Sequence, residues 1–181
     1  MGYLDKAKVY LCGGIDLCDD CGIPWRRDIR NKTRNIKKIK VKFFDPTDKP
    51  NGLVSECGIE KNKVNELKKA GMLKEAGDYV KRFRRYDLRM VDFSDFLIIK
   101  IDLNYHLCGS YFEVETACRQ QKPVFAIIEQ GRNSCPNWLL SYLKPEEIFN
   151  NVDECVYYLV KLDKGEIPLD DRWVIIDLDE I

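Results

Sequence analysis

Residues 95–101 read Asp95-Phe-Leu-Ile-Ile-Lys-Ile101, an almost continuous apolar run of the length of a strand. Such a run is typical of a strand that is buried on both faces, as in a parallel sheet covered by helices. Shorter apolar runs lie at 8–12 and 123–128. Residues 40–44 alternate between polar and apolar side chains before a turn at Asp45-Pro46. These segments predict the strands of one sheet, and residues 173–178 are compatible with a last strand.

Segments with helical composition or periodicity separate the predicted strands. They span residues 24–39, 60–85, 110–121, 138–143 and 152–162, and Gly71 and Gly77 are candidates to divide the second of them. Strands that alternate with helices predict an α/β fold. We expect a doubly wound, flavodoxin- or Rossmann-like domain with a mostly parallel five-stranded sheet and helices on both faces.

The length and charge of the chain limit the number of domains and the kinds of partner that we expect. A chain of 181 residues suits one substantial core, so we expect a single domain over residues 1–181, with its core at about 8–162. The tail, 163–181, would add an edge strand or an oligomer contact. Lys and Arg number 30 and so do Asp and Glu, so no net field favours nucleic acid or an anionic membrane. No apolar segment approaches the ~20 residues of a membrane span, and we expect a cytoplasmic protein.

The eight cysteines are expected to stay reduced in a chain without a secretion signal. Cys18 and Cys21 form the only C-x-x-C pair, and the only histidine, His106, is distant in the sequence, so we expect loop thiols and no metal site. The chain has neither a G-x-G-x-x-G fingerprint nor a P-loop, and we expect no cofactor.

A site in such a sheet lies beyond the carboxyl ends of the strands, where the strand order reverses. For the order 2-1-3-4-5, the loops that begin at Leu11-Cys-Gly-Gly and at Asp102-Leu-Asn-Tyr face each other there. The candidate residues in or near these loops are Tyr10, Gly13, Gly14, Asp16, Asp102 and Glu113.

Glu113 has two interpretations. Ser110-Tyr-Phe-Glu113 has the form of a capping box, in which the carboxylate would only bind backbone N–H groups. Alternatively, the positive end of the helix keeps Glu113 ionised and able to attack an electron-poor carbon such as the anomeric carbon of a sugar. Asp87 could then protonate the leaving group, and Tyr10 could fix the rotamer of Glu113.

Three motifs in order resemble the nucleoside 2-deoxyribosyltransferase superfamily, which also contains nucleoside 5′-monophosphate N-glycosidases. They are Val9-Tyr-Leu-Cys-Gly-Gly-Ile15, Arg85-Tyr-Asp87 before Asp92-Phe-Ser-Asp-Phe-Leu-Ile-Ile99, and Gly109-Ser-Tyr-Phe-Glu113 before Ala117 and Lys122-Pro-Val124. The resemblance covers about residues 8 to 128.

The resemblance implies that Glu113 is the nucleophile, Asp87 the acid and base for the nucleobase, and Tyr10 the residue that orients Glu113. It also implies a homodimer or higher homo-oligomer, in which a neighbour helps to complete the site. The expected substrate-binding residues are Gly13, Gly14, Asp16, Trp25, Asp102, Gly109 and Ser110. The chain departs from the family at 106–108, where many transferases carry an Asp, and at Glu115, where a Gly is common.

We therefore expect an enzyme that cleaves the N-glycosidic bond of a (deoxy)ribonucleoside or a nucleoside 5′-monophosphate through a covalent glycosyl-Glu113 intermediate. Transfer to a second base and transfer to water both stay open. The arginines at 82, 84 and 85, with Arg26 and Arg27, could bind a phosphate or merely solvate the surface. The alternatives are an inactive nucleotide-binding sensor of the same fold and an unrelated domain in which Glu113 only caps a helix.

Overall fold

The computed structural model describes residues 2–49 and 57–176. Within them, one sheet has the strand order β2-β1-β3-β4-β5, and each neighbouring pair is parallel. The strands are β1 (Lys8–Gly13), β2 (Lys42–Phe44), β3 (Phe96–Ile101), β4 (Val124–Ile128) and β5 (Ile148–Phe149). The predicted doubly wound fold is confirmed, and the strand order reverses between β1 and β3.

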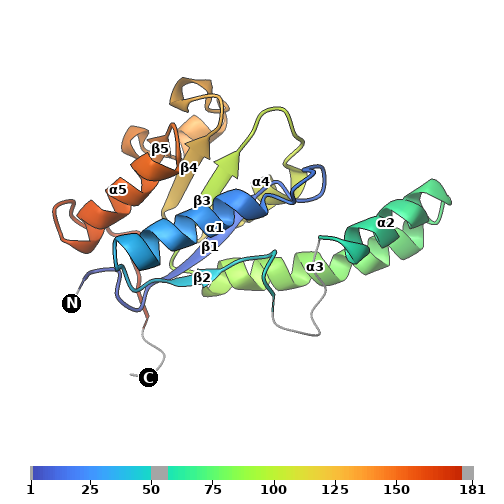
Figure 1. The fold of residues 1–181 in the computed structure, drawn as a ribbon, viewed down its shortest axis with the longest axis horizontal. Coiled ribbons are helices and arrows are strands. Elements are labelled where there is room, and N and C mark those ends of the chain that lie inside the picture. Colours follow the sequence, from blue (N-terminus) through green and yellow to red (C-terminus); the bar gives the residue numbers. More distant parts are fainter. Residues whose placement is uncertain (1, 50–56, 177–181) are drawn as a thin grey trace.

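Helices cover both faces of this sheet (Figure 1). The α-helices are α1 (Ile23–Asn31), α2 (Ile59–Lys69), α3 (Leu73–Phe93), α4 (Cys108–Arg119) and α5 (Val152–Asp163). Helices α1 and α5 pack on one face, whereas α4 and the end of α3 pack on the other. The rest of α3 pairs with α2 and extends away from the sheet. No helix in the described part of the chain is long and apolar enough to cross a membrane.

Alternation along β1 assigns its side chains to the two faces. Val9 and Leu11 belong to the core under α1 and α5, whereas Tyr10 and Cys12 belong to the core under α3 and α4. In β3, residues 96–99 and Ile101 are completely buried, as the unbroken apolar run predicts.

The helical segments at 24–39 and 60–85 differ from the predictions at their boundaries. Helix α1 ends at Asn31, and a π-helical turn follows at Lys32–Ile36. Gly71, with a φ of 74°, separates α2 from α3, but Gly77 lies inside α3 and divides nothing. A single glycine lowers the helix propensity of a segment but does not by itself end the helix.

Two predicted elements are wrong. Residues 138–143 form only a 3-10 turn at Leu139–Ser141, with no α-helix. Residues 173–176 form no strand, and residues 177–178 lie outside the described part of the chain. Instead, the Trp173 ring packs 5.1 Å from the Phe96 ring and 6.1 Å from the Phe125 ring, so this part of the tail covers a face of its own sheet.

Candidate active site

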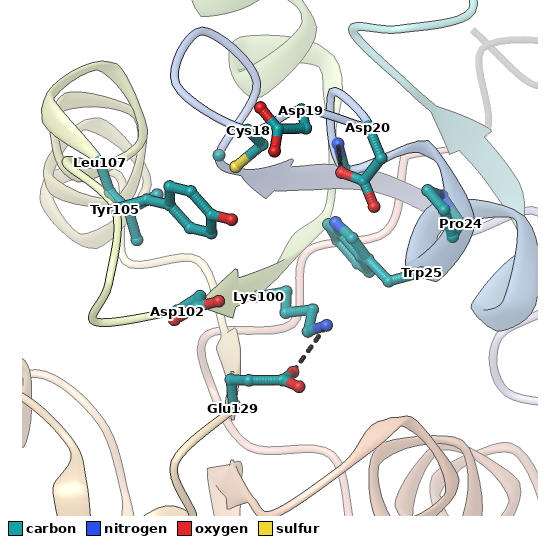
Figure 2. Close-up of a pocket in the computed structure, with 12 residues that line it drawn as sticks. Cys18, Asp19, Asp20, Pro24, Trp25, Lys100, Asp102, Tyr105, Leu107 and Glu129 are labelled. Carbon is teal, nitrogen blue, oxygen red and sulfur yellow. Dashed lines mark hydrogen bonds and ion pairs between the residues drawn. The ribbon is translucent and has the colours of Figure 1, made fainter.

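A cavity of about 350 Å³ lies at the carboxyl ends of β1, β3 and β4, beside the start of α1. Figure 2 shows the Trp25 and Tyr105 rings on opposite sides of it, with Lys100 and Asp102 between them. The cavity is lined by Gly14, Cys18, Asp19, Asp20, Gly22, Pro24, Trp25, Lys100, Asp102, Tyr105, Leu107 and Glu129.

Carboxylates dominate the charge of this cavity. Among the described residues that line it, four are acidic and one, Lys100, is a cation, which lies 2.7 Å from Glu129. Hydrogen bonds from the Asn104 backbone N–H, and from the Gln130 and Asn104 side chains, keep the pKa of Asp102 below its usual range. The cavity therefore favours a neutral or cationic ligand over an anionic one.

Two glycines let the loop after β1 approach its neighbours. A Cβ at Gly13, whose φ is 150°, would lie 2.9 Å from the Lys100 carbonyl oxygen. A Cβ at Gly14 would lie 2.7 Å from Cys18 Sγ and 3.0 Å from the Leu107 side chain. Larger residues would push the loop away from β3 and from the start of α4.

Glu113 lies on the other side of β1, where α4 packs. The Tyr10 hydroxyl donates to its Oε1 at 2.7 Å, and the Cys12 thiol lies 2.9 Å from its Oε2. Helix α4 begins at Cys108, with Leu107 as the N-cap residue and no side-chain cap. The predicted capping box is therefore wrong, because Glu113 lies in the second turn and its carboxyl group binds side chains of β1.

Burial sets the protonation of Glu113. The pKa of this carboxyl group is raised to about 7, chiefly by desolvation on burial and in smaller part by the negative charge of Asp87. The hydrogen bonds from Cys12 and Tyr10 oppose this rise. The expectation that the helix end keeps Glu113 firmly ionised is wrong, because that effect fades beyond the first turn and desolvation is larger here.

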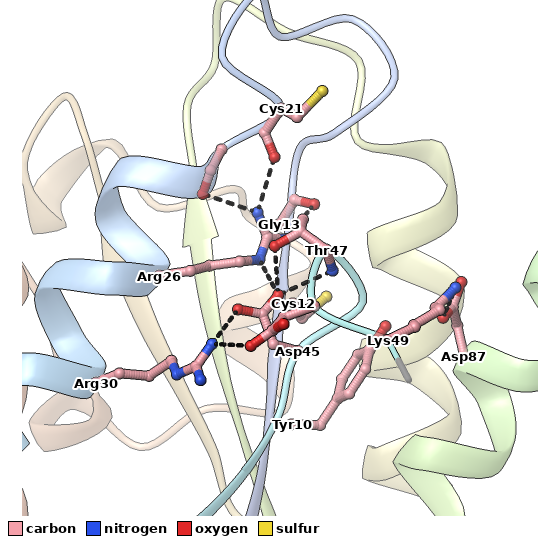
Figure 3. A network of polar contacts seen from close by, with 12 residues as sticks. Tyr10, Cys12, Gly13, Cys21, Arg26, Arg30, Asp45, Thr47, Lys49 and Asp87 are labelled. Atoms are coloured by element: carbon pink, nitrogen blue, oxygen red, sulfur yellow. Dashed lines mark hydrogen bonds and ion pairs between the residues drawn. The ribbon is translucent and has the colours of Figure 1, made fainter. Parts of the chain in front are cut away.

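Asp87 extends from α3 towards the same side of the sheet. Its carboxylate lies 2.7 Å from Lys49 Nζ (Figure 3), and both side chains are almost completely buried. The negative charge of Asp87 contributes to the raised pKa of Glu113. Sequence reasoning missed Lys49, because one cation in a turn-like segment after Asp45-Pro46 gives no signal of its own.

The arginines considered for phosphate binding are not brought to the cavity. Arg26 is completely buried and donates to the carbonyl oxygens of Gly13, Cys21 and Gly22 (Figure 3). Arg82 and Arg85 lie on the exposed surface of α3, where they line a separate hollow and not the cavity described above. Arg27 and Arg84 are exposed.

The remaining candidates divide between the two sides of β1. Gly14, Trp25 and Asp102 line the cavity, whereas Tyr10, Asp87 and Glu113 do not. Asp16 and Gly109 are exposed and lie outside the lining, and Ser110 is buried with its carbonyl oxygen 3.5 Å from Cys12 Sγ. Leu107, from the segment that departs from the family pattern, lines the cavity directly before the helix of Glu113. Tyr105 and Glu129 were missed, although both follow predicted strands.

Cys18 and Cys21 are both thiols. In residues 2–49 and 57–176, no group of three or more His, Cys, Asp or Glu side chains is arranged to hold a metal ion.

Comparison with known proteins gives a structural relative. No protein-family model and no curated protein sequence matches the chain. A 2-deoxyribosyltransferase from Bacillus psychrosaccharolyticus superposes with a TM-score of 0.53 and 16% sequence identity, over 84% of this chain and 92% of that one. A conserved protein from Enterococcus faecalis V583 gives a TM-score of 0.48 and 14% identity, over 89% and 99% of the two chains.

The first comparison establishes that the chain has a nucleoside 2-deoxyribosyltransferase-like fold. At 16% identity the likeness concerns the fold alone, and the chemistry must be argued from this chain's own residues.

Proposed function

We propose that the protein is an N-glycosyl enzyme that cleaves the bond between the sugar and the base of a nucleoside, with Glu113 as the nucleophile. The observation that carries this proposal is the Glu113 carboxyl group, which Tyr10 and Cys12 hold by its two oxygens beside the reversal of strand order. A structural relative whose name is 2-deoxyribosyltransferase supports the same class of reaction.

The reaction has two displacements at the anomeric carbon. In the first, a Glu113 oxygen forms a bond to this carbon while the carbon–nitrogen bond breaks, and the electron pair leaves with the base. Asp87 is the proposed acid and base: in its protonated form it passes a proton to the leaving nitrogen and becomes a carboxylate, which the Lys49 ammonium at 2.7 Å stabilises. In the second displacement, water or another base attacks the anomeric carbon, loses its proton to the same group, and releases the Glu113 carboxylate.

The charge of the neighbouring cavity supports an uncharged nucleoside as the substrate, in preference to a 5′-monophosphate. Its lining is acidic, and Arg26 is occupied by backbone carbonyl oxygens. The Trp25 and Tyr105 rings offer flat apolar surfaces on which a base can stack.

The test is Glu113→Gln, assayed with a panel of nucleosides and 5′-monophosphates, each with and without an acceptor base. The variant should lose release or exchange of the base by at least about a thousandfold, since the amide cannot form the covalent intermediate. Glu75→Gln is the control, because Glu75 is an exposed glutamate in the first turn of α3, which packs against α2. It should keep full activity.

The products decide the acceptor. Free base without an acceptor indicates hydrolysis, and exchange that requires a second base indicates transfer. Unchanged turnover by Glu113→Gln would exclude Glu113 as the nucleophile. A wild-type protein that binds nucleotides and consumes none of the panel would instead be a sensor of the same fold.

A further inference from the structure

The two oxygens of the proposed nucleophile have donors of unequal strength. We propose that Cys12 is a positioning residue for Glu113. The Cys12 thiol fixes Oε2 of Glu113 in place, and it leaves Oε2 more nucleophilic than Oε1. This inference rests on the proposed function, because it assigns a role within the same reaction.

The backbone of β1 determines the arrangement. Tyr10 and Cys12 are two residues apart in a strand, so both side chains point to the face that α4 covers. Both residues are completely buried. With one donor on each oxygen, at 2.7 Å for Tyr10 and 2.9 Å for Cys12, the plane of the Glu113 carboxyl group is fixed.

The buried Cys12 thiol keeps its proton beside Glu113. Burial raises the pKa of Cys12 well above its usual range, and the negative charge of Glu113 raises it further. Cys12 therefore acts as an S–H donor and does not compete as a thiolate nucleophile. The Ser110 carbonyl oxygen, at 3.5 Å, is the more distant acceptor for the same proton.

The difference between the donors assigns the attacking atom. A thiol is a weak hydrogen-bond donor and a phenol is a stronger one, so Oε1 loses more electron density than Oε2. Oε2 then forms the bond to the anomeric carbon as the carbon–nitrogen bond breaks, and the electron pair leaves with the base. The Cys12 proton stays on sulfur throughout.

Other charged groups also act on Glu113, and the experiment must separate them from the thiol. The negative charge of Asp87 raises the pKa of Glu113, and the positive charge of Arg26 lowers it. Lys49 pairs with Asp87, and Tyr10 donates to the other oxygen. None of these groups changes when Cys12 alone is substituted.

The experiment compares Cys12→Ala, which removes the donor, with Cys12→Ser, which keeps one of greater strength. The pKa of Glu113 is measured by NMR titration of the protein labelled with ¹³C at Glu carboxyl groups, and Glu113→Gln assigns the signal. Cys12→Ala should raise this pKa and Cys12→Ser should lower it. Cys155→Ala is the control, because Cys155 is equally buried but belongs to α5, on the opposite face of the sheet.

Activity provides a second measurement. In Cys12→Ala, kcat should fall on the order of tenfold and the acid limb of the pH profile should move to higher pH, with KM little changed. In Cys12→Ser, the acid limb should move to lower pH. The inference is overturned if both Cys12 variants have the same Glu113 pKa and the same pH profile as the control variant Cys155→Ala.

The titration does not require turnover, so it separates the two proposals. A wild-type protein that is inactive on every nucleoside refutes the proposed function, and the NMR shift still decides whether Cys12 holds Glu113.

Discussion

At Glu113, burial of the carboxyl group destabilises the fold where this group is ionised. The pKa rises from 4.5 to about 7 on folding, so between these values the folded protein binds more protons than the unfolded chain. The free energy of unfolding must therefore fall as the pH rises from about 4.5 to about 7, and stay low above that range. A shift of this size corresponds to about 3 kcal/mol.

Glu113→Gln should remove this loss of stability, because the amide resembles the protonated acid and carries no charge. We expect the variant to be more stable than the wild type by about 2–3 kcal/mol at pH 8 and nearly equal to it at pH 4. Urea denaturation of both proteins across this range measures the difference. A variant that is no more stable than the wild type at pH 8 would contradict the assigned burial of the carboxyl group.

At the scale of elements, Arg26 joins the end of β1 to the start of α1. Its guanidinium donates to Gly13 O and Gly22 O at 3.0 Å and to Cys21 O at 3.2 Å, and its Nε lies 3.6 Å from Asp45. These carbonyl oxygens belong to the loop that borders the cavity. The shape of the cavity therefore depends on one buried cation.

Arg26→Met should destabilise the protein by about 3 kcal/mol or more, because it leaves the buried carbonyl oxygens of this loop without their donor and removes the cation beside the buried Asp45 carboxylate. Arg27→Met is the matched control, since Arg27 is the next residue in α1 and is exposed. It should change stability by less than about 0.5 kcal/mol. Chemical denaturation gives both values, and equal effects of the two substitutions would refute the structural role of Arg26.

The success of sequence reasoning varied between elements for physical reasons. The apolar run at 96–101 identified β3 and the class of fold, because burial on both faces leaves little choice of residues. The run at 173–176 has similar composition but covers a sheet face through Trp173, and composition does not distinguish packing on a sheet from pairing within it. Short amphipathic segments such as 138–143 are equally ambiguous.

The candidate site was predictable to the same degree. Tyr10 and Glu113 were placed together by the predicted strand order, and the hydrogen bond between them is present. The capping box failed because α4 begins two residues before Ser110, and helix starts are poorly defined by sequence. Cys12 and Lys49 depend on contacts between distant segments, which a single sequence does not reveal.

At the scale of the whole molecule, the outer surface of α4 and the segment after β4 carry exposed aromatic rings beside an apolar groove. Phe112 is 60% exposed and Trp138 is 84% exposed, beside a groove of about 550 Å³. The groove is lined by Cys108, Tyr111, Phe112, Val114, Glu115, Pro136, Trp138, Leu139 and Tyr142. A face with both a groove and protruding rings of the same chemistry can complement itself, as a two-fold interface requires.

We therefore propose that this face joins two copies of the chain. The Glu115–Arg119 ion pair at its edge offers charges of both signs, which a two-fold axis can pair between copies. Phe112→Glu should convert a dimer into a monomer, because it places a charge in the apolar contact. Tyr157→Glu is the matched control, since Tyr157 is also 60% exposed but lies on α5, which packs on the opposite face of the sheet.

Light scattering during size-exclusion chromatography measures the mass of each protein. We expect a dimer for the wild type and Tyr157→Glu, and a monomer for Phe112→Glu with an unchanged circular dichroism spectrum. Since Phe112 is adjacent to Glu113 on α4, a partner at this face would also limit the movement of the helix that holds the proposed nucleophile. The monomeric variant should then lose activity even though its Glu113 is intact. A monomeric wild type, or a Phe112→Glu variant that stays dimeric, would rule out this interface.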